Sequence, residues 1–409
     1  MTSSSRRGAR TPDCGSPGTG AAPRPLRNPL FLHLLWTSPN TERQERPLQA
    51  DRTRILDAEA IATIVTKVGL GQLYDLTIAR LETVLATGRD APVEMKQRDG
   101  FLIETPHLGL LEWMPALRHG ATVSMKMVGY NPHNPVKNQL PTILSTLCAF
   151  DADSGHLRTV IDGTFATAIR TGAASALASR VLARPDSAVL GLVGCGAQAV
   201  TQLHALSRVF SFSEILVCDE DVRAENSFAA RSRLPAGAVR IAPLAEVEER
   251  ADVLCTATSV APYAGPVIRG TNLKPWVHIN AIGSDMPGKT ELPLELLRRA
   301  VVCPDHVAQA RAEGDCQQLA PEEIGPSLAE ILLDPEAHRK LSPVTTVYDS
   351  TGLALQDLVM VEVFEELARD LGVGHHLAIE ATADDPQDPY SFLPGPVTRS
   401  WEGQPGARR

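Results

Sequence analysis

One segment constrains the fold of this chain more than any other: residues 188–206, which read AVLGLVGCGAQAVTQLHAL. It opens with an apolar run typical of a buried strand, and residues 197–209 carry apolar side chains at helical spacing. Gly194 and Gly196 lie between the two patterns. A glycine turn that joins a buried strand to a helix is typical of the first unit of a doubly wound α/β sheet.

Strand and helix patterns continue to alternate after this segment. The predicted strands are EILVCD, VRIA, DVLCTAT, WVHINAIG and VVCPD, and the predicted helices between them are VRAENSFAARS, LAEVEERA and ELPLELLRRA. Such alternation favours a parallel sheet with helices on both faces.

The flanking parts of the chain have a different character. Residues 54–88 show helical periodicity with Asp57 as an N-cap candidate, and 92–162 contain several strand-like segments. Residues 164–183 form a predicted helix with Thr164 as its cap, and 350–372 form a long amphipathic helix expected to return to the first part. The predicted fold class is therefore α/β, with a Rossmann-type dinucleotide domain inserted into an α+β domain that is built from both ends of the chain.

The predicted domains are a disordered arm over 1–53, the first part of the α+β domain over 54–169, the dinucleotide domain over 170–345, the returning part of the α+β domain over 346–390, and a flexible tail over 391–409. A length of 409 residues suits two or three domains.

Composition excludes several function classes. The formal net charge of −9 disfavours a nucleic-acid partner, and no apolar run is long enough to span a membrane. The seven cysteines are scattered and form no disulfide framework or zinc spacing, so we expect a cytoplasmic protein without a metal site.

The glycine turn predicts the nature of the ligand. Gly194 would allow the tight turn, Gly196 would let the backbone approach a pyrophosphate, and the helix N-terminus would supply free N–H groups. Asp219 ends the next predicted strand, where a carboxylate can accept the ribose hydroxyls. Because Glu220 and Asp221 would repel a 2′-phosphate, NAD is favoured over NADP.

Several longer motifs resemble the ornithine cyclodeaminase and mu-crystallin family over about residues 54–370. They are LEWMP, KMVGYNPHNP, DADSGHLRTVIDGTFATAIRTGAASALASRVLARPD, GLVGCGAQA, NAIGSDMPGKTEL and VYDSTGLALQD. The resemblance implies that the α+β domain serves substrate binding and dimerisation, with a small amino acid as substrate, and that the inserted domain binds NAD. In the family's cyclodeaminases, NAD takes a hydride from Cα of ornithine or lysine, the side-chain amine attacks the imine, ammonia leaves, and the hydride returns to give proline or pipecolate.

The substrate carboxylate needs cations. Lys126 lies in a predicted strand among apolar residues, and Arg170 lies in a helix of small residues; the resemblance assigns both to the carboxylate, and Arg170 also to the cofactor. Arg98 is the nearest candidate for a further family arginine, although its spacing from LEWMP differs from the family pattern.

Two carboxylates are the predicted catalytic residues. Asp285 follows a strand of the parallel sheet, and the chemistry needs a group that takes a proton from the substrate ammonium. Glu112 matches the family's glutamate near the reacting carbon and suits the second amine of a diamino acid. The matched motifs add cofactor contacts at Thr142, Ala197, Gln198, Thr258, Asn280, Lys289 and Ser350, and a substrate contact at Thr351.

Two other functions stay open at this point. The same residues would serve a ketimine reductase or an amino-acid dehydrogenase with net redox chemistry. A binding protein without catalysis is the other alternative, although such a protein has no need of Asp285. The turn GYNPHN departs from the glycine-histidine-proline turn of ornithine cyclodeaminases, which leaves the substrate's chain length open.

Overall fold

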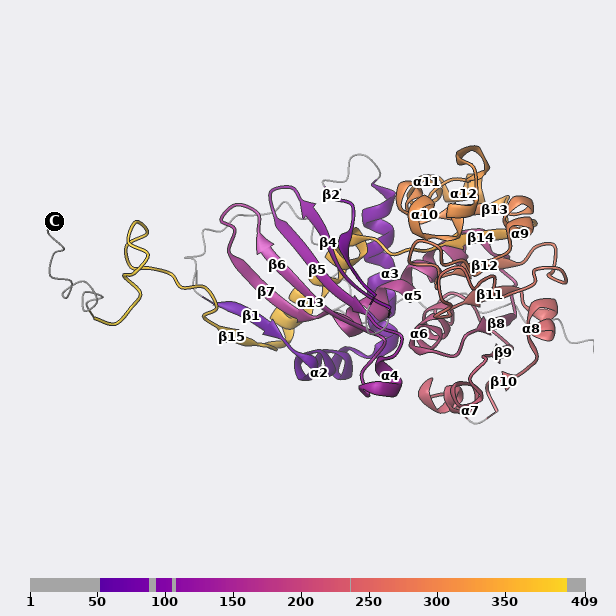
Figure 1. Cartoon of the computed structure of the whole chain (residues 1–409), viewed down its shortest axis with the longest axis horizontal. Helices are drawn as coiled ribbons and strands as arrows, with labels where there is room; N and C mark the ends of the chain where they lie inside the picture. The colour runs from indigo at the N-terminus through magenta and orange to yellow at the C-terminus, as the bar shows by residue number, and fades with distance from the viewer. Residues whose placement is uncertain (1–51, 88–92, 105–107, 236, 396–409) are drawn as a thin grey trace, which may run out of the picture. The chain divides into compact units, whose positions relative to one another are not determined.

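The computed structural model describes residues 52–87, 93–104, 108–235 and 237–395. Almost all of the predicted arm over 1–53 and most of the tail over 391–409 lie outside the described residues. The described chain builds two sheets, each with its own helices (Figure 1).

The seven-stranded sheet comes from the middle of the chain. Its strands lie in the order β10-β9-β8-β11-β12-β14-β13, and every neighbouring pair is parallel. Their bounds are β8 Val189–Val193, β9 Glu214–Cys218, β10 Arg240–Ile241, β11 Val253–Thr256, β12 His278–Ala281, β13 Val301–Pro304 and β14 Thr346–Asp349. The direction of connection reverses between β8 and β11, which is where doubly wound sheets bind their ligands. The predicted parallel, Rossmann-type sheet is confirmed.

Short helices connect these strands. They are α6 Ala197–Leu206, α7 Val222–Arg231, α8 Leu244–Arg250, α9 Leu294–Arg299 and α10 Val307–Glu313, followed by the 3₁₀ turns η2 Asp315–Gln318 and η3 Pro321–Glu323 and by α11 Leu328–Leu333 and α12 Pro335–Arg339. The region from α10 to α12 carried no sequence prediction, because its elements are too short to show a clear period.

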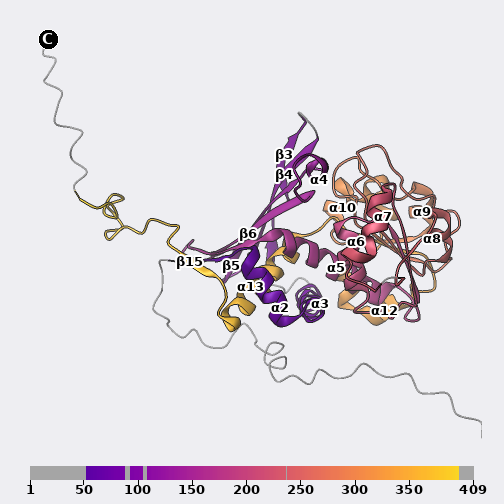
Figure 2. The same ribbon diagram turned by 90° about the horizontal axis from the view of Figure 1, so that it is seen from below.

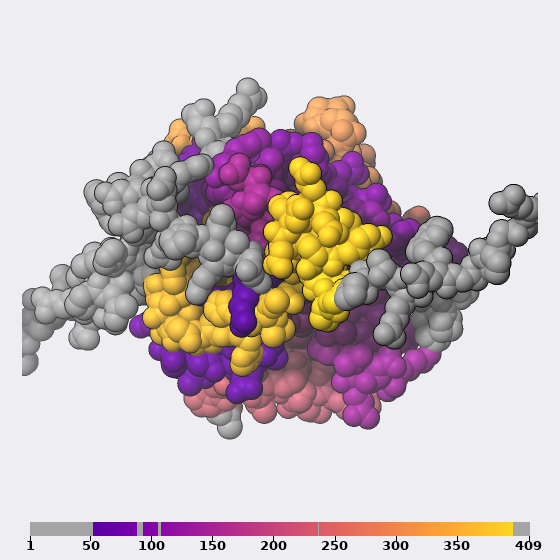
Figure 3. Space-filling view, turned by 90° about the vertical axis from the view of Figure 1, so that its left-hand side faces the viewer, coloured from indigo at the N-terminus to yellow at the C-terminus, as the bar shows by residue number. Residues whose placement is uncertain are grey.

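The eight-stranded sheet is built from both ends of the described chain. Its order is β15-β1-β7-β6-β5-β4-β2, with β3 paired to β4. The bounds are β1 Thr53–Leu56, β2 Val93–Met95, β3 Asp99–Ile103, β4 Gly109–Arg118, β5 Thr122–Tyr130, β6 Ile143–Asp151, β7 Leu157–Asp162 and β15 His375–Leu377. The indigo strand β1 lies among yellow C-terminal residues in Figure 3, as its antiparallel pairing with β15 requires.

Helices cover one face of this sheet and form the largest apolar core of the described residues. They are α2 Ala58–Val68, α3 Leu70–Ala86, α5 Gly163–Leu182 and α13 Ala354–Leu371, while the short α4 Asn134–Lys137 follows β5. Helix α13 packs on β4, β5 and β6, and α5 contacts α3 on one side and α6 on the other (Figure 2). Helix α5 therefore links the two sheets, and α13 brings the chain back to the first one.

Three local predictions need correction. Residues 54–88 begin with a strand and then form two helices, because Gly69 breaks the helical path with φ +90°. Thr164 is not the cap of its helix: Asp162 accepts from the Thr164 amide and caps α5. The last long helix begins at Ala354, so residues 350–353 form a loop. The predicted cap Asp57 is confirmed, since its side chain accepts from the Ala60 amide.

Candidate functional site

Most of the predicted ligand-binding residues follow strands of the parallel sheet. Gly194 follows β8, Asp219 follows β9, Thr258 lies two residues after β11, Asp285 four residues after β12, and Ser350 directly after β14. Because all of these strands are parallel, their carboxyl ends share one edge of the sheet, and the residues that follow them gather there.

The glycine turn is shaped for close approach. Gly194 has φ +93°, and a Cβ at this position would lie 2.6 Å from the carbonyl oxygen of Ala257. At Gly196 a Cβ would meet nothing within 4 Å, so that side of the turn is open. Helix α6 begins at Ala197 without a side-chain cap, which leaves its first N–H groups available. The turn therefore fits a dinucleotide pyrophosphate.

Asp219 is held beside this turn. Its carboxylate accepts from the amide of Cys195 at 2.5 Å and from the amide of Asp221 at 2.8 Å. Arg231 donates to the carbonyl oxygen of Cys195 from the other side. The carboxylate thus ties the end of β9 to the turn after β8, where a ribose hydroxyl would be accepted.

A pair of alanine substitutions separates folding from ligand binding in this turn. Gly194→Ala is expected to lower the free energy of unfolding by about 2 kcal/mol, because it adds a side chain at positive φ against backbone. Gly196→Ala, at φ −76°, is expected to fold normally and to weaken dinucleotide binding by filling the open side. Thermal unfolding and NAD titration of both variants check this, and equal unfolding temperatures would contradict it.

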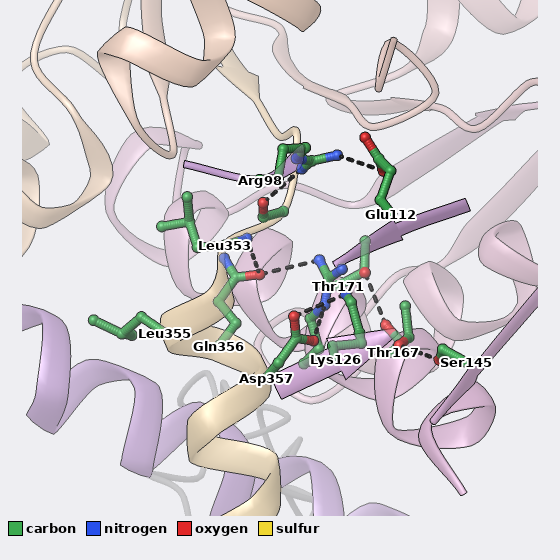
Figure 4. Close-up of polar contacts among 12 residues, drawn as sticks. Arg98, Glu112, Lys126, Ser145, Thr167, Thr171, Leu353, Leu355, Gln356 and Asp357 are labelled. Carbon is green, nitrogen blue, oxygen red and sulfur yellow. Dashed lines mark hydrogen bonds and ion pairs between the residues drawn. The ribbon is translucent and has the colours of Figure 1, made fainter. Parts of the chain in front are cut away.

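Two predicted carboxylate-binding cations lie together in the interior. The Nζ atom of Lys126, on β5, is 2.8 Å from Oδ2 of Asp357 (Figure 4). The Nε atom of Arg170, on α5, is 3.3 Å from Oδ1 of the same residue. Burial lowers the pKa of Lys126 to about 8, against the opposing effect of Asp357. The two cations enter the site from different elements and share one anion on α13.

Arg98 provides a third cation, between two carboxylates. Its Nη1 atom lies 3.0 Å from Oε2 of Glu313 and 3.5 Å from Oε2 of Glu112. Its Nη2 atom donates to the carbonyl oxygens of Thr351 and Gly352, which fixes the guanidinium (Figure 4 shows Arg98 and Glu112). Burial raises the pKa of Glu112, and it raises that of Glu313 to about 7; Arg98 opposes both shifts.

Asp285 forms its own ion pair. Its Oδ1 accepts from Nζ of Lys289 at 2.7 Å, and that ammonium also lies 4.9 Å from the ring centroid of Tyr130. Burial works to lower the pKa of Lys289, but Asp285 and Tyr130 outweigh it, so the pKa is raised. The Asp285 side chain is 32% exposed while that of Lys289 is 2% exposed, so the carboxylate presents the accessible end of this pair.

One pocket unites the predicted substrate residues. Its lining includes all six residues predicted for substrate and catalysis, namely Arg98, Glu112, Lys126, Arg170, Asp285 and Thr351. Apolar side chains complete it, among them Leu110, Met114, Val128, Ile143 and Met286. The pocket can therefore hold a molecule with a carboxylate at one end, amines near the acidic groups, and an aliphatic chain between them.

The other predicted cofactor residues have varied surroundings. Thr258 donates through both its amide and its hydroxyl to Glu291, whose carboxylate also accepts from the Gly283 amide near Asp285. Asn280 is fully buried in β12, and its side chain bonds with Ser179. Thr142 precedes β6, Gln198 lies in the first turn of α6, and Ser350 is buried after β14.

Sequence reasoning missed four polar residues: Tyr130 and Thr167, which line the pocket, and Glu313 and Asp357, which pair with the lining residues Arg98 and Lys126. Asp357 had a signal in the sequence, since it is the last residue of the motif VYDSTGLALQD and an acid on the buried side of a predicted helix. Glu313 had no comparable signal, because it ends a short helix that the sequence pattern did not reveal.

Within the described ranges, no group of three or more His, Cys, Asp or Glu side chains is arranged to hold a metal ion. No helix in the part of the chain that the structure describes has the length and apolar character to cross a membrane.

The fold and pocket together define a class: a dinucleotide-type sheet beside a pocket for a small amino acid. Comparison with known proteins gives the family. The model of the ornithine cyclodeaminase/mu-crystallin family matches residues 60–371, and the chain belongs to this family.

Three relatives illustrate the similarity. L-lysine cyclodeaminase of Streptomyces rapamycinicus is 42% identical over 342 residues, which cover 83% of this chain and all of that protein. A lysine cyclodeaminase structure solved for its recognition of L-lysine, L-ornithine and L-2,4-diaminobutyric acid is 45% identical, with a TM-score of 0.81 over 83% of this chain and 99% of that one. An archaeal alanine dehydrogenase dimer with bound NAD is 30% identical, with a TM-score of 0.72 over 80% of this chain and 100% of that one.

Proposed function

We propose that this chain is an NAD-dependent cyclodeaminase that converts a diamino acid, such as L-lysine or L-ornithine, into a cyclic imino acid with release of ammonia and no net redox change. The observation that carries the proposal is the pocket in which Asp285 and Glu112 face the same space as Lys126 and Arg170. The similarity to lysine cyclodeaminases over most of the chain supports it.

The pocket residues divide the work. Lys126 and Arg170 hold the substrate carboxylate, with Arg98 and Thr351 beside them. Asp285 takes a proton from the α-ammonium, because a hydride leaves only from a carbon that bears a neutral amine. NAD held at the glycine turn would supply the acceptor for that hydride and, once reduced, the donor for the cyclic imine. Glu112 receives the side-chain amine of the substrate and directs it toward Cα. The side-chain amine attacks the imine carbon there, and the α-nitrogen leaves as ammonia.

The charge distribution favours a diamino substrate over an amino acid with one amine. Glu112, Asp285 and Glu313 influence one another electrostatically, and Arg98 and Lys289 are the cations paired with them. An additional ammonium on the substrate would relieve the repulsion among these three buried or half-buried carboxylates. A substrate such as alanine offers no such charge.

The test is a stoichiometry. The enzyme with L-lysine or L-ornithine and NAD in less than molar proportion to the amino acid is expected to release ammonia beyond the amount of NAD, without accumulation of NADH. Accumulation of NADH in step with ammonia would instead show an amino-acid dehydrogenase. Reduction of a cyclic imine at the expense of NADH, with no reaction from the diamino acids, would show a ketimine reductase. No turnover of any of them, with retained ligand binding, would show a binding protein.

The same proposal includes three further points: the cofactor contacts of the residues named above, the domain boundaries, and a cytoplasmic location. NAD in place of NADP is supported by the acidic residues Asp219, Glu220 and Asp221 after β9. A reducing compartment is supported by six cysteines that are free in the structure: Cys148, Cys195, Cys218, Cys255, Cys303 and Cys316.

A homodimer is also part of the proposal, and the face of the eight-stranded sheet opposite its helices supports it. Leu111 on β4, Met127 on β5 and Leu144 on β6 are 38%, 41% and 38% exposed, and the pairing of these strands makes them neighbours. Phe101 on β3 is 64% exposed and packs edge-on against Trp113. A contiguous apolar face of this kind is typical of a subunit interface.

A single substitution that introduces a charge tests this interface. Leu144→Glu is expected to convert a dimer into monomers in sedimentation experiments, because it places a carboxylate in the apolar face. Leu333→Glu is the matched control, since Leu333 is 57% exposed on α11. A Leu144→Glu protein that sediments as the unchanged protein does would contradict the interface.

A further inference from the structure

Asp357 is the anion on which the carboxylate-binding half of the pocket is built. It lies in the first turn of α13 and is 1% exposed. One of its oxygens is 2.8 Å from Nζ of Lys126, and the other is 3.3 Å from Nε of Arg170. Figure 4 labels Asp357 on the helix α13 beside Lys126 on the strand β5, and Arg170 belongs to the helix α5.

Asp357 acts from behind the pocket. Lys126 and Arg170 both line the pocket, whereas Asp357 is not among its lining residues. Its neighbour Gln356 accepts from Nη1 of Arg170 at 3.1 Å, so two successive side chains of α13 orient one guanidinium. The start of α13 therefore determines where both cations point.

Two buried cations this close to each other need such an anion. Each disfavours the charge of the other, and burial disfavours both. A substrate carboxylate can supply a counter-charge only after it has bound. An anion that is always present keeps the cations charged and separated in the empty pocket, so the carboxylate meets a site that is already arranged.

We propose that Asp357 is a positioning residue that keeps Lys126 charged and holds it and Arg170 in place to receive the substrate carboxylate. The inference rests on the proposed function only in that the substrate is an amino acid. It concerns substrate capture and leaves the proton-transfer role of Asp285 unchanged.

The groups around Lys126 determine whether the loss of Asp357 raises or lowers the pKa of this lysine. The charged groups that act on it are Asp357 from α13, Arg170 from α5, Arg98 from the segment before β3, and Glu112 from β4. Burial lowers the pKa of Lys126 to about 8, Asp357 raises it, and the two arginines lower it. Loss of Asp357 would lower this pKa further, so the ammonium would be lost at a lower pH.

The experiment compares two neutralising substitutions on one helix. Asp357→Asn is expected to shift the alkaline limb of L-lysine affinity by about one to three pH units toward lower pH. The affinity is measured by calorimetry on the full-length enzyme loaded with NADH in place of NAD, because NADH cannot accept the hydride and the L-lysine is therefore not consumed. Because the pKa of Lys126 is about 8, a shift of one unit should raise the dissociation constant at pH 8 about fivefold, and a larger shift should raise it further. In Glu362→Gln, which removes the α13 carboxylate paired with Arg118, the limb is expected to stay in place.

Further measurements keep the outcomes separate. Asp357→Glu keeps the charge and is expected to retain the wild-type alkaline limb, which a purely structural role would not require. Unchanged affinity in Asp357→Asn would overturn the inference, because the cations would then not need this anion. Tighter binding with an unmoved limb would also overturn it, because Asp357 would then compete with the substrate carboxylate for the two cations. If Asp357→Asn fails to fold, a displaced limb in Asp357→Glu would overturn it. Wild-type enzyme that binds L-lysine without releasing ammonia would refute cyclodeamination alone.

Discussion

Asp285→Asn is expected to reduce kcat by about 10²- to 10⁴-fold, the range typical for loss of a positioned proton acceptor. The asparagine amide occupies nearly the same space and still accepts from Lys289, but it cannot take a proton from the α-ammonium. Because Asp285 belongs to the pocket and not to the glycine turn, NAD affinity should change little. Ammonia release and NAD titration of the same preparation give the two quantities.

The control for this variant is Asp186→Asn, which removes an aspartate that is 70% exposed and paired only with Arg184 among the described residues. It should behave as the unchanged enzyme. If kcat of Asp285→Asn stays within threefold of the wild-type value, Asp285 takes no part in the chemical steps. A large rise in the dissociation constant of NAD would mean that Asp285 acts on the cofactor instead.

The second prediction concerns two buried lysines, whose substitutions are expected to change different kinetic constants. Lys126→Met is expected to raise KM for the diamino acid by about 10- to 100-fold, since a hydrogen bond to a charged group contributes about 1.5–3 kcal/mol. Lys289→Met removes the cation paired with Asp285 and is expected to act mainly on kcat. Both residues are nearly fully buried, at 1% and 2% exposure, so the substitutions are matched in environment.

Steady-state kinetics of the two lysine variants, with NAD saturating and then varied, tests this division. If Lys126→Met changes kcat and leaves KM unaltered, the carboxylate lies elsewhere. If Lys289→Met acts only on the KM for NAD, Lys289 contacts the cofactor, as the family resemblance implies, and its pairing with Asp285 has no catalytic consequence.

The sequence predicted the dinucleotide sheet well because its signals are local. A buried strand, a glycine at positive φ and a helix without a side-chain cap all occur within residues 189–206. Asp219 directly follows the next strand, and its carboxylate meets the turn there. Each of these features depends on neighbours along the chain, and periodicity with turn chemistry reports such neighbours.

The pocket residues were predicted by a different route. Lys126, Arg170 and Asp285 were found through family motifs, and the structure brings them to one pocket. Arg98 was uncertain by spacing, but its position between Glu112 and Glu313 places it there as well. Spacing failed as a guide because β3 lies between Arg98 and the matched motif, and a hairpin can change in length without moving its base.

Some partners are beyond the reach of sequence patterns. Asp357 is separated from Lys126 by 231 positions in the numbering and meets it only when α13 packs on β5. Glu313 meets Arg98 across a comparable separation, at the end of a helix of 7 residues. The sequence shows the charge of each residue, but the fold determines which charges are neighbours.

The measurement that tests the central claim most directly follows the hydrogen at Cα. L-lysine or L-ornithine carrying deuterium at Cα, incubated with the enzyme and unlabelled NAD, should give a cyclic imino acid that retains the deuterium at that carbon, since the same hydride is removed and returned. Mass spectrometry of the product gives the answer. A cyclic product without the deuterium, or deuterium that accumulates in NADH, would contradict the account.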